Sequence, residues 1–132
     1  MERLPNFDPG PDSPPLPAVG VAIAAEPAAT PADTVVRGSW RVPDDWPEDA
    51  PAPGAIWLIA AGRNSRLCWN GRPAGDALPF AGEVAHEGWF NVRLGECCDL
   101  PERFAGRLDV TAVLGEWKSK TLELEFAIRE SP

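Results

Sequence analysis

Apolar and polar residues alternate along the last third of the chain. The apolar positions of segment 107–114 are Leu108, Val110, Ala112 and Leu114, and those of segment 121–128 are Leu122, Leu124, Phe126 and Ile128. Thr121, Glu123 and Glu125 lie between the apolar residues of the second segment. A period of two places successive side chains on opposite faces of an extended strand, so both segments are predicted to be half-buried β-strands.

Five further segments carry strand signals, and they span residues 19–25, 34–42, 55–61, 66–70 and 89–94. The core-facing residues predicted for two of them are Val36, Trp40 and Val42, and Phe90, Val92 and Leu94. The residues predicted to face outward are Arg37, Ser39, Arg41, Asn91 and Arg93. Segment 55–61 is almost wholly apolar, which predicts a central strand buried on both faces.

Breaks rich in Gly, Pro and Asp separate these segments, and no stretch of ten or more residues keeps a helical period. Pro and Gly together account for 28 of the 132 residues, which is typical of strands joined by many turns. The longest breaks are residues 43–54, 71–87 and 95–106. About seven strands without an intervening helix predict an all-β fold, a single immunoglobulin-like antiparallel β-sandwich.

The segment AGRLDVTAVLGEWKSKTLELEFAI resembles the closing hairpin of immunoglobulin-like and fibronectin type III-like domains. The matching positions are Gly106, Leu108, Val110 and Ala112, with Ser119 before the last strand. Those families often have a tyrosine where Leu108 stands, but this chain contains no tyrosine and lacks the antibody-type Cys-Trp-Cys pattern. The resemblance implies a fold and no particular function.

Residues 1–17 hold six of the sixteen prolines and three acidic side chains. Such a composition buries too little apolar area to offset chain entropy, so a disordered or extended tail is expected before a sandwich domain at 18–132. The tail acts either as a solubilising segment or as a docking segment, because proline-rich chains lose little entropy when they become ordered.

The formal net charge is −8, and residues 1–53 contribute nine acidic and only three basic side chains. An acidic surface repels phosphate groups, so neither nucleic acid nor an anionic membrane is expected as a partner. No apolar run approaches the ~18 residues of a membrane-spanning helix. A cytoplasmic location is expected. Secretion is the minority alternative, because the apolar segment 18–25 is similar to the apolar region of a secretory signal peptide.

The three cysteines, Cys68, Cys97 and Cys98, form a poor disulfide framework and are expected to be reduced thiols. Metal binding through Cys97 and Cys98 is the weaker alternative, since the further ligands would have to come from elsewhere. No cofactor is expected.

His86 is the only histidine, and no catalytic motif is present, so the chain is not expected to be an enzyme. A Cys–His pair would need His86 beside a cysteine.

Six tryptophans are more informative. Trp40, Trp57, Trp69 and Trp89 lie in predicted strands and are expected to pack in the core or at a sheet edge. Trp46 and Trp117 lie in the predicted loops 43–54 and 115–120. In an immunoglobulin-like sandwich these two loops emerge at the same end. The acidic residues around them are Asp44, Asp45, Glu48, Asp49 and Glu116.

The sequence therefore favours a non-catalytic interaction module or accessory subunit. It would bind a partner protein with a basic surface through this acidic, Trp-bearing end. In one alternative, the two indoles only cap the open end of the sandwich. A small carbohydrate-binding module, a calcium site in the Asp44–Asp49 cluster and a self-assembling sandwich that associates through exposed strand edges also stay open.

Overall fold

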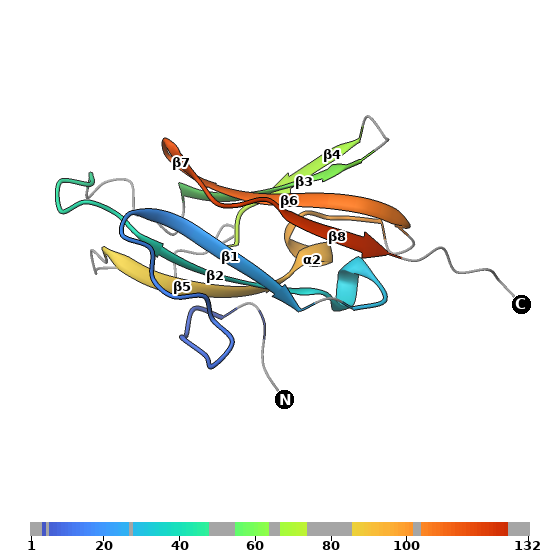
Figure 1. Cartoon of the computed structure of the whole chain (residues 1–132), viewed down its shortest axis with the longest axis horizontal. Coiled ribbons are helices and arrows are strands. Elements are labelled where there is room, and N and C mark those ends of the chain that lie inside the picture. Colours follow the sequence, from blue (N-terminus) through green and yellow to red (C-terminus); the bar gives the residue numbers. More distant parts are fainter. Residues whose placement is uncertain are drawn as a thin grey trace, which may run out of the picture.

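The computed structural model describes residues 4, 6–26, 28–47, 55–63, 67–73, 86–101 and 104–126. They form two antiparallel sheets that pack face to face (Figure 1). The first sheet has the order β1-β2-β5, with β1 (Gly20–Glu26), β2 (Val35–Arg41) and β5 (Glu87–Arg93). The second contains β4 (Cys68–Gly71), β3 (Ile56–Gly62), β6 (Gly106–Leu114), β7 (Trp117–Lys118) and β8 (Leu122–Phe126). The predicted all-β sandwich is confirmed.

In the second sheet, β3 lies between β4 and β6, and both β7 and β8 pair with β6. Two single turns of helix, η1 (Pro31–Asp33) and α2 (Leu94–Cys97), close one end of the sandwich. The Leu94 N–H donates to the Thr34 carbonyl at 2.9 Å, which joins α2 to the start of β2. We call this the helical end. No helix in the described ranges is long and apolar enough to cross a membrane.

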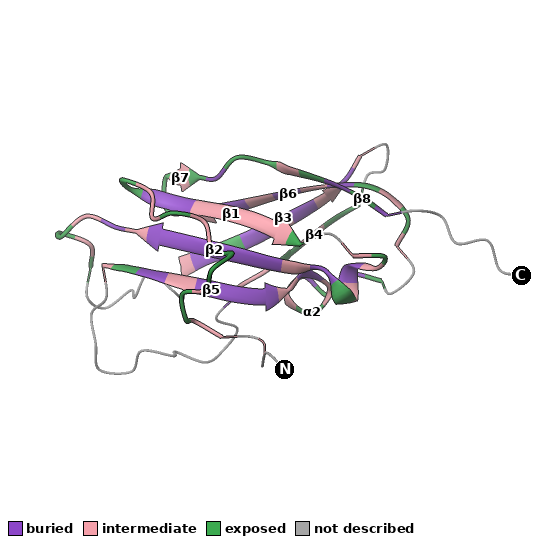
Figure 2. Ribbon diagram, turned by 60° about the horizontal axis from the view of Figure 1, so that its bottom comes forward, coloured by how far each residue is buried: buried purple, intermediate pink, exposed green. Residues whose placement is uncertain are grey.

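The core lies between the two sheets, where the buried positions of β2, β3, β5 and β6 meet (Figure 2). Its largest fully buried side chains include Trp40, Phe90, Ile56, Leu58, Leu94, Leu108 and Leu114. Every second residue of β6 is buried, as the alternation predicts for a strand with one face on a core.

Three polar residues predicted to face solvent are instead buried, namely Arg37, Ser39 and Asn91. They do point away from the core, but the chain before β1 covers them. The Ser39 hydroxyl donates to the Pro15 carbonyl at 2.9 Å, and the Asn91 side-chain amide donates to Oδ1 of Asn6 at 2.6 Å. The period of two correctly assigned these residues to the outer face of the first sheet. It could not reveal that a segment distant in the chain covers that face.

β3 is not buried on both faces, contrary to the prediction. Its residues alternate, and the Trp57 side chain is 42% exposed. Trp57, Ile59 and Ala61 lie on the outer face of the five-stranded sheet, and no described element packs over them as a further layer.

The last hairpin is tighter than predicted. Gly115, at a φ of +60°, and Glu116 make the turn, and the chain re-enters the sheet at β7. Ser119 then interrupts the pairing, because its hydroxyl oxygen accepts from the Ala112 N–H at 2.9 Å. β7 thus lies within the predicted loop 115–120, and β8 corresponds to the predicted last strand 121–128. Trp117 lies in a strand and not in a loop, which corrects the prediction.

Candidate functional site at the acidic end

The loop that follows β2 and the β6–β7 hairpin lie at the same end of the sandwich, opposite the helical end. Their indoles are in contact, because the ring centroids of Trp46 and Trp117 lie 6.2 Å apart at an interplanar angle of 37°. We call the surface formed by Trp46, Trp117 and the carboxylates of these two segments the acidic end. The two segments are about 70 residues apart in the chain, and sandwich topology brings them together.

Local structure positions each indole. The backbone N–H of Trp46 donates to the Pro43 carbonyl at 3.0 Å, and this hydrogen bond closes a turn directly after β2. Trp117 pairs with Leu114 in the β6–β7 ladder. Glycines make room for both rings: a Cβ on Gly115 would lie 3.3 Å from the Trp46 ring, and one on Gly20 would lie 2.9 Å from Cβ of Trp117.

Both indoles are half-buried, whereas Asp44, Asp45 and Glu116 are exposed. Trp46 also packs against the core, so this end combines a cap over the sandwich with a partly open aromatic surface. Glu48 and Asp49, the other two acidic residues predicted for the site, lie outside the described residues. Carboxylates next to half-open indoles can attract a cationic partner and then bury apolar area against it.

A second aromatic surface adjoins this end on the outer face of β3, and sequence reasoning missed it. Trp57 lies opposite Val113, and Val113 lies opposite Lys118. The Arg72 guanidinium lies 5.5 Å from the Trp57 ring centroid, in cation–π geometry. We call Arg72, Trp57, Val113 and Lys118 the cationic row. Lys118 next to Trp117 was the only signal in the sequence, since the apolar run 55–61 hides which residues face outward.

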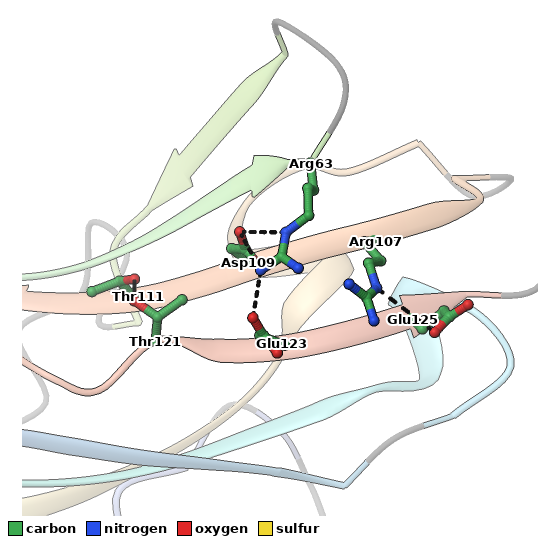
Figure 3. Close-up of polar contacts among 7 residues, drawn as sticks. All are labelled: Arg63, Arg107, Asp109, Thr111, Thr121, Glu123 and Glu125. Atoms are coloured by element: carbon green, nitrogen blue, oxygen red, sulfur yellow. Dashed lines mark hydrogen bonds and ion pairs between the residues drawn. The ribbon is translucent and has the colours of Figure 1, made fainter.

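Farther along the same outer face, polar side chains are bonded to one another (Figure 3). Arg63 donates to Asp109 at 3.1 Å and also to Glu123, so one guanidinium joins carboxylates from β6 and β8. The hydrogen bond with Arg63 lowers the pKa of Glu123, and Glu123 in turn raises the pKa of Arg63.

Two further pairs extend this arrangement. The Thr111 and Thr121 hydroxyls lie 2.8 Å apart, and Arg107 lies 3.9 Å from a carboxylate oxygen of Glu125. The charges on this part of the sheet are therefore compensated locally.

His86 is not placed for Cys–His chemistry. It lies near the acidic end, where its carbonyl accepts from the Val42 N–H at 2.8 Å. Cys97 and Cys98 lie at the helical end, and Cys68 pairs with Ala61 near that end of β3. Among the described residues no hydrogen bond joins His86 to a cysteine, and its Nδ1 is buried without a partner.

The three cysteines are free thiols, and only Cys98 is fully buried. The Cys98 thiol, as a hydrogen-bond partner, lowers the pKa of Cys97 against the opposing effect of burial. The same hydrogen bond and burial raise the pKa of Cys98. Within the described ranges, no group of three or more His, Cys, Asp or Glu side chains is arranged to hold a metal ion.

The sequence matches no protein family model, and no curated protein or solved structure matches the chain.

Proposed function

We propose that this chain is a non-catalytic interaction module that binds a partner protein through its acidic end. The observation that carries the proposal is the pair of half-buried indoles, Trp46 and Trp117, 6.2 Å apart beside exposed carboxylates. Tryptophan dominates binding hot spots because it buries a large area and loses little conformational entropy. Asp44, Asp45 and Glu116 would steer a partner with a basic surface toward these rings.

We also propose that the sandwich is of the immunoglobulin-like type. The second and fifth strands pair in one sheet, and the third and sixth pair in the other, as strands B and E and strands C and F do in that fold. β4 lies beside β3 at the position of strand C′, and β7 with β8 takes the position of strand G. Loops between such strands commonly carry binding surfaces on a rigid scaffold.

The experiment that tests the proposed function is affinity purification with the full chain, followed by binding kinetics with the recovered partner. The first variant, Asp44→Asn/Asp45→Asn, removes exposed charge and leaves both indoles in place. It should lower the association rate constant and weaken its dependence on salt, because the charges act during encounter. The second variant, Trp46→Ser/Trp117→Ser, should raise the dissociation rate constant at least tenfold.

A matched control neutralises two exposed carboxylates near the helical end, Glu96→Gln/Glu125→Gln. Its binding should equal that of the unchanged chain. All variants need the same thermal midpoint as the unchanged chain, because Trp46 and Trp117 also contribute to packing. If a stoichiometric partner binds both acidic-end variants with the same affinity as it binds the unchanged chain, the binding site lies elsewhere on the molecule. Recovery of no partner would contradict the proposal.

A further inference from the structure

The outer face of the first sheet is covered by a proline-rich part of the chain itself. Residues 6–17, which we call the proline-rich segment, contain five prolines among twelve residues and precede β1. We propose that this face binds proline-rich, extended segments of other proteins, and that residues 6–17 are its occupant within the chain. The inference does not rest on the proposed function, because it concerns a sheet face and not the acidic end.

Polar donors on β2 and β5 are directed at this segment. Ser39 and Asn91 are buried, although both lie on the side of the first sheet that faces away from the core. The proline-rich segment lies on that same side, below β2 and β5 in Figure 1, whereas the second sheet lies above them. A buried donor without an acceptor is costly, so this face requires a chain that brings oxygen atoms to it.

Most of the contacts are made with the main chain of the segment. The Ser39 hydroxyl donates to the Pro15 carbonyl at 2.9 Å, and the Asn91 side-chain amide donates to the Asp8 carbonyl at 2.9 Å. Asn6 and Asn91 also exchange two backbone hydrogen bonds. Every residue carries a carbonyl oxygen, so these contacts depend on an extended backbone more than on particular side chains. Other chains of that conformation can therefore make them.

The residue types on this face are those that suit proline-rich ligands. Trp89 lies opposite Ser39 in the β2–β5 ladder, so the two side chains share the covered face, and Trp89 is half-buried. Recognition of the polyproline II conformation commonly combines an aromatic surface with such donors. Proline has no N–H and is already restricted in φ, so a proline-rich ligand brings acceptors and loses little entropy when it binds.

The resident segment is longer than the two donors require. The Asp8 and Pro15 carbonyls are seven positions apart, and the chain between them turns at residues 10–13, where the Ser13 N–H donates to the Gly10 carbonyl at 3.1 Å. Ser39 and Asn91 are diagonal neighbours on β2 and β5, and such residues lie about 7–8 Å apart. A polyproline II chain rises about 3.1 Å per residue, so about three residues span this distance.

This difference in length favours another protein over a second copy of the chain. A second copy would offer the same segment and the same contacts. It would compete against a resident segment whose effective concentration is of millimolar order, because that segment is covalently attached. A partner segment without the turn satisfies both donors with fewer ordered residues, so it can displace residues 6–17.

Fluorescence anisotropy with the full chain and two labelled peptides tests the inference. One peptide is residues 6–17, and the other is the joined peptide NFDPPPLP, in which residues 6–9 are followed directly by residues 14–17. The joined peptide should bind at least threefold more tightly than residues 6–17, because four fewer residues become ordered. Nitrogen-15 NMR of the full chain should show shifts at Ser39, Trp89 and Asn91 when the joined peptide is added.

The same substitution placed in the chain or in the peptide should have opposite effects. Asn6→Ala in the full chain removes the oxygen that accepts from the Asn91 amide at 2.6 Å and so weakens only the resident segment. Binding of the joined peptide should then strengthen by about three- to tenfold, the value of one hydrogen bond. Asn6→Ala in the peptide should weaken binding by a similar factor. Asp12→Ala in the chain is the matched control, because Asp12 is exposed in the turn, and it should change nothing.

Three outcomes would overturn the inference. The first is no binding of the joined peptide up to about 1 mM. The second is binding that Asn6→Ala in the chain leaves unchanged, since the peptide would then occupy a different surface. The third is tighter binding of residues 6–17 than of the joined peptide, which would make a second copy the occupant. Trp46→Ser/Trp117→Ser should bind the joined peptide like the unchanged chain, so a failure of the acidic end is distinguishable from a failure here.

Discussion

Asn6 and Asn91 pair as an isolated antiparallel bridge, although 85 positions separate them in the chain. Each backbone N–H donates to the other residue's carbonyl, at 3.0 and 2.8 Å. The Asn91 side-chain amide also donates to the Asp8 carbonyl at 2.9 Å, and its Oδ1 accepts from Arg37 at 3.0 Å. The segment before β1 is thereby bonded to β5, the edge strand of the first sheet.

Replacement of Asn91 by Ala should destabilise the protein. Asn91 is 1% exposed, and loss of its side chain removes one of the acceptors of the buried Arg37, which also donates to Glu26, and the donor to two groups of the N-terminal segment. The free energy of unfolding in urea should fall by about 1–3 kcal/mol, the usual cost of buried polar groups left without partners. Asn6→Ala, at a more exposed residue, should cost less. If Asn91→Ala is as stable as the unchanged chain, these hydrogen bonds make no net contribution to the free energy of unfolding.

Gly38 is required because the Phe90 ring lies directly over it. A Cβ at this position would lie 2.0 Å from Cζ of Phe90, its partner across the β2–β5 ladder. Gly38→Ala should therefore lower the free energy of unfolding by about 1–3 kcal/mol, since the ring cannot stay in place. Gly10→Ala is the matched control, because a Cβ there meets nothing nearer than 3.8 Å. Equal stability of the two variants would contradict the close contact.

The Glu123 carboxylate should titrate below its ordinary range because Arg63 donates a hydrogen bond to it. A depressed pKa in the folded state means that the pair stabilises the protein above the unfolded-state pKa. This stabilisation is lost as the pH falls through the folded-state pKa. Carbon-13 NMR titration should show the pKa of Glu123 rising in Arg63→Met. Arg107→Gln should change it less, because Arg107 makes the smallest contribution to the shift. Equal pKa values in the unchanged chain and Arg63→Met would refute the assignment.

Cys97 should react with iodoacetamide at lower pH than an ordinary thiol, because the hydrogen bond with Cys98 lowers its pKa. In a Cys68→Ser background, Cys98→Ala should shift the midpoint of the rate against pH upward, since the thiolate loses that partner. Cys98 itself should stay unmodified in the folded chain, because it is buried and its pKa is raised. Mass spectrometry of the labelled peptides distinguishes the two adjacent positions. A midpoint unchanged by Cys98→Ala would contradict the coupling.

Local pattern was sufficient to locate every described strand except β7. Period two in 107–114 places Leu108 and Val110 on the core, and the structure has them fully buried. Alternation predicts the buried face because one face of a half-buried strand must be apolar, whichever strands it pairs with. The meeting of Trp46 and Trp117 at one end also followed once a sandwich was assumed, and their ring contact agrees with it.

What the sequence alone determined is thus the fold class, the approximate positions of the described strands except β7, and the acidic, tryptophan-bearing end. Only the tertiary structure decided which residues of the apolar segment 55–61 face outward, since an unbroken apolar run carries no alternation, and Trp57 proved exposed. It alone decided that Arg37, Ser39 and Asn91 are buried, because the covering segment comes from distant positions in the chain. Burial depends on what packs against a face, and that information lies in other parts of the chain.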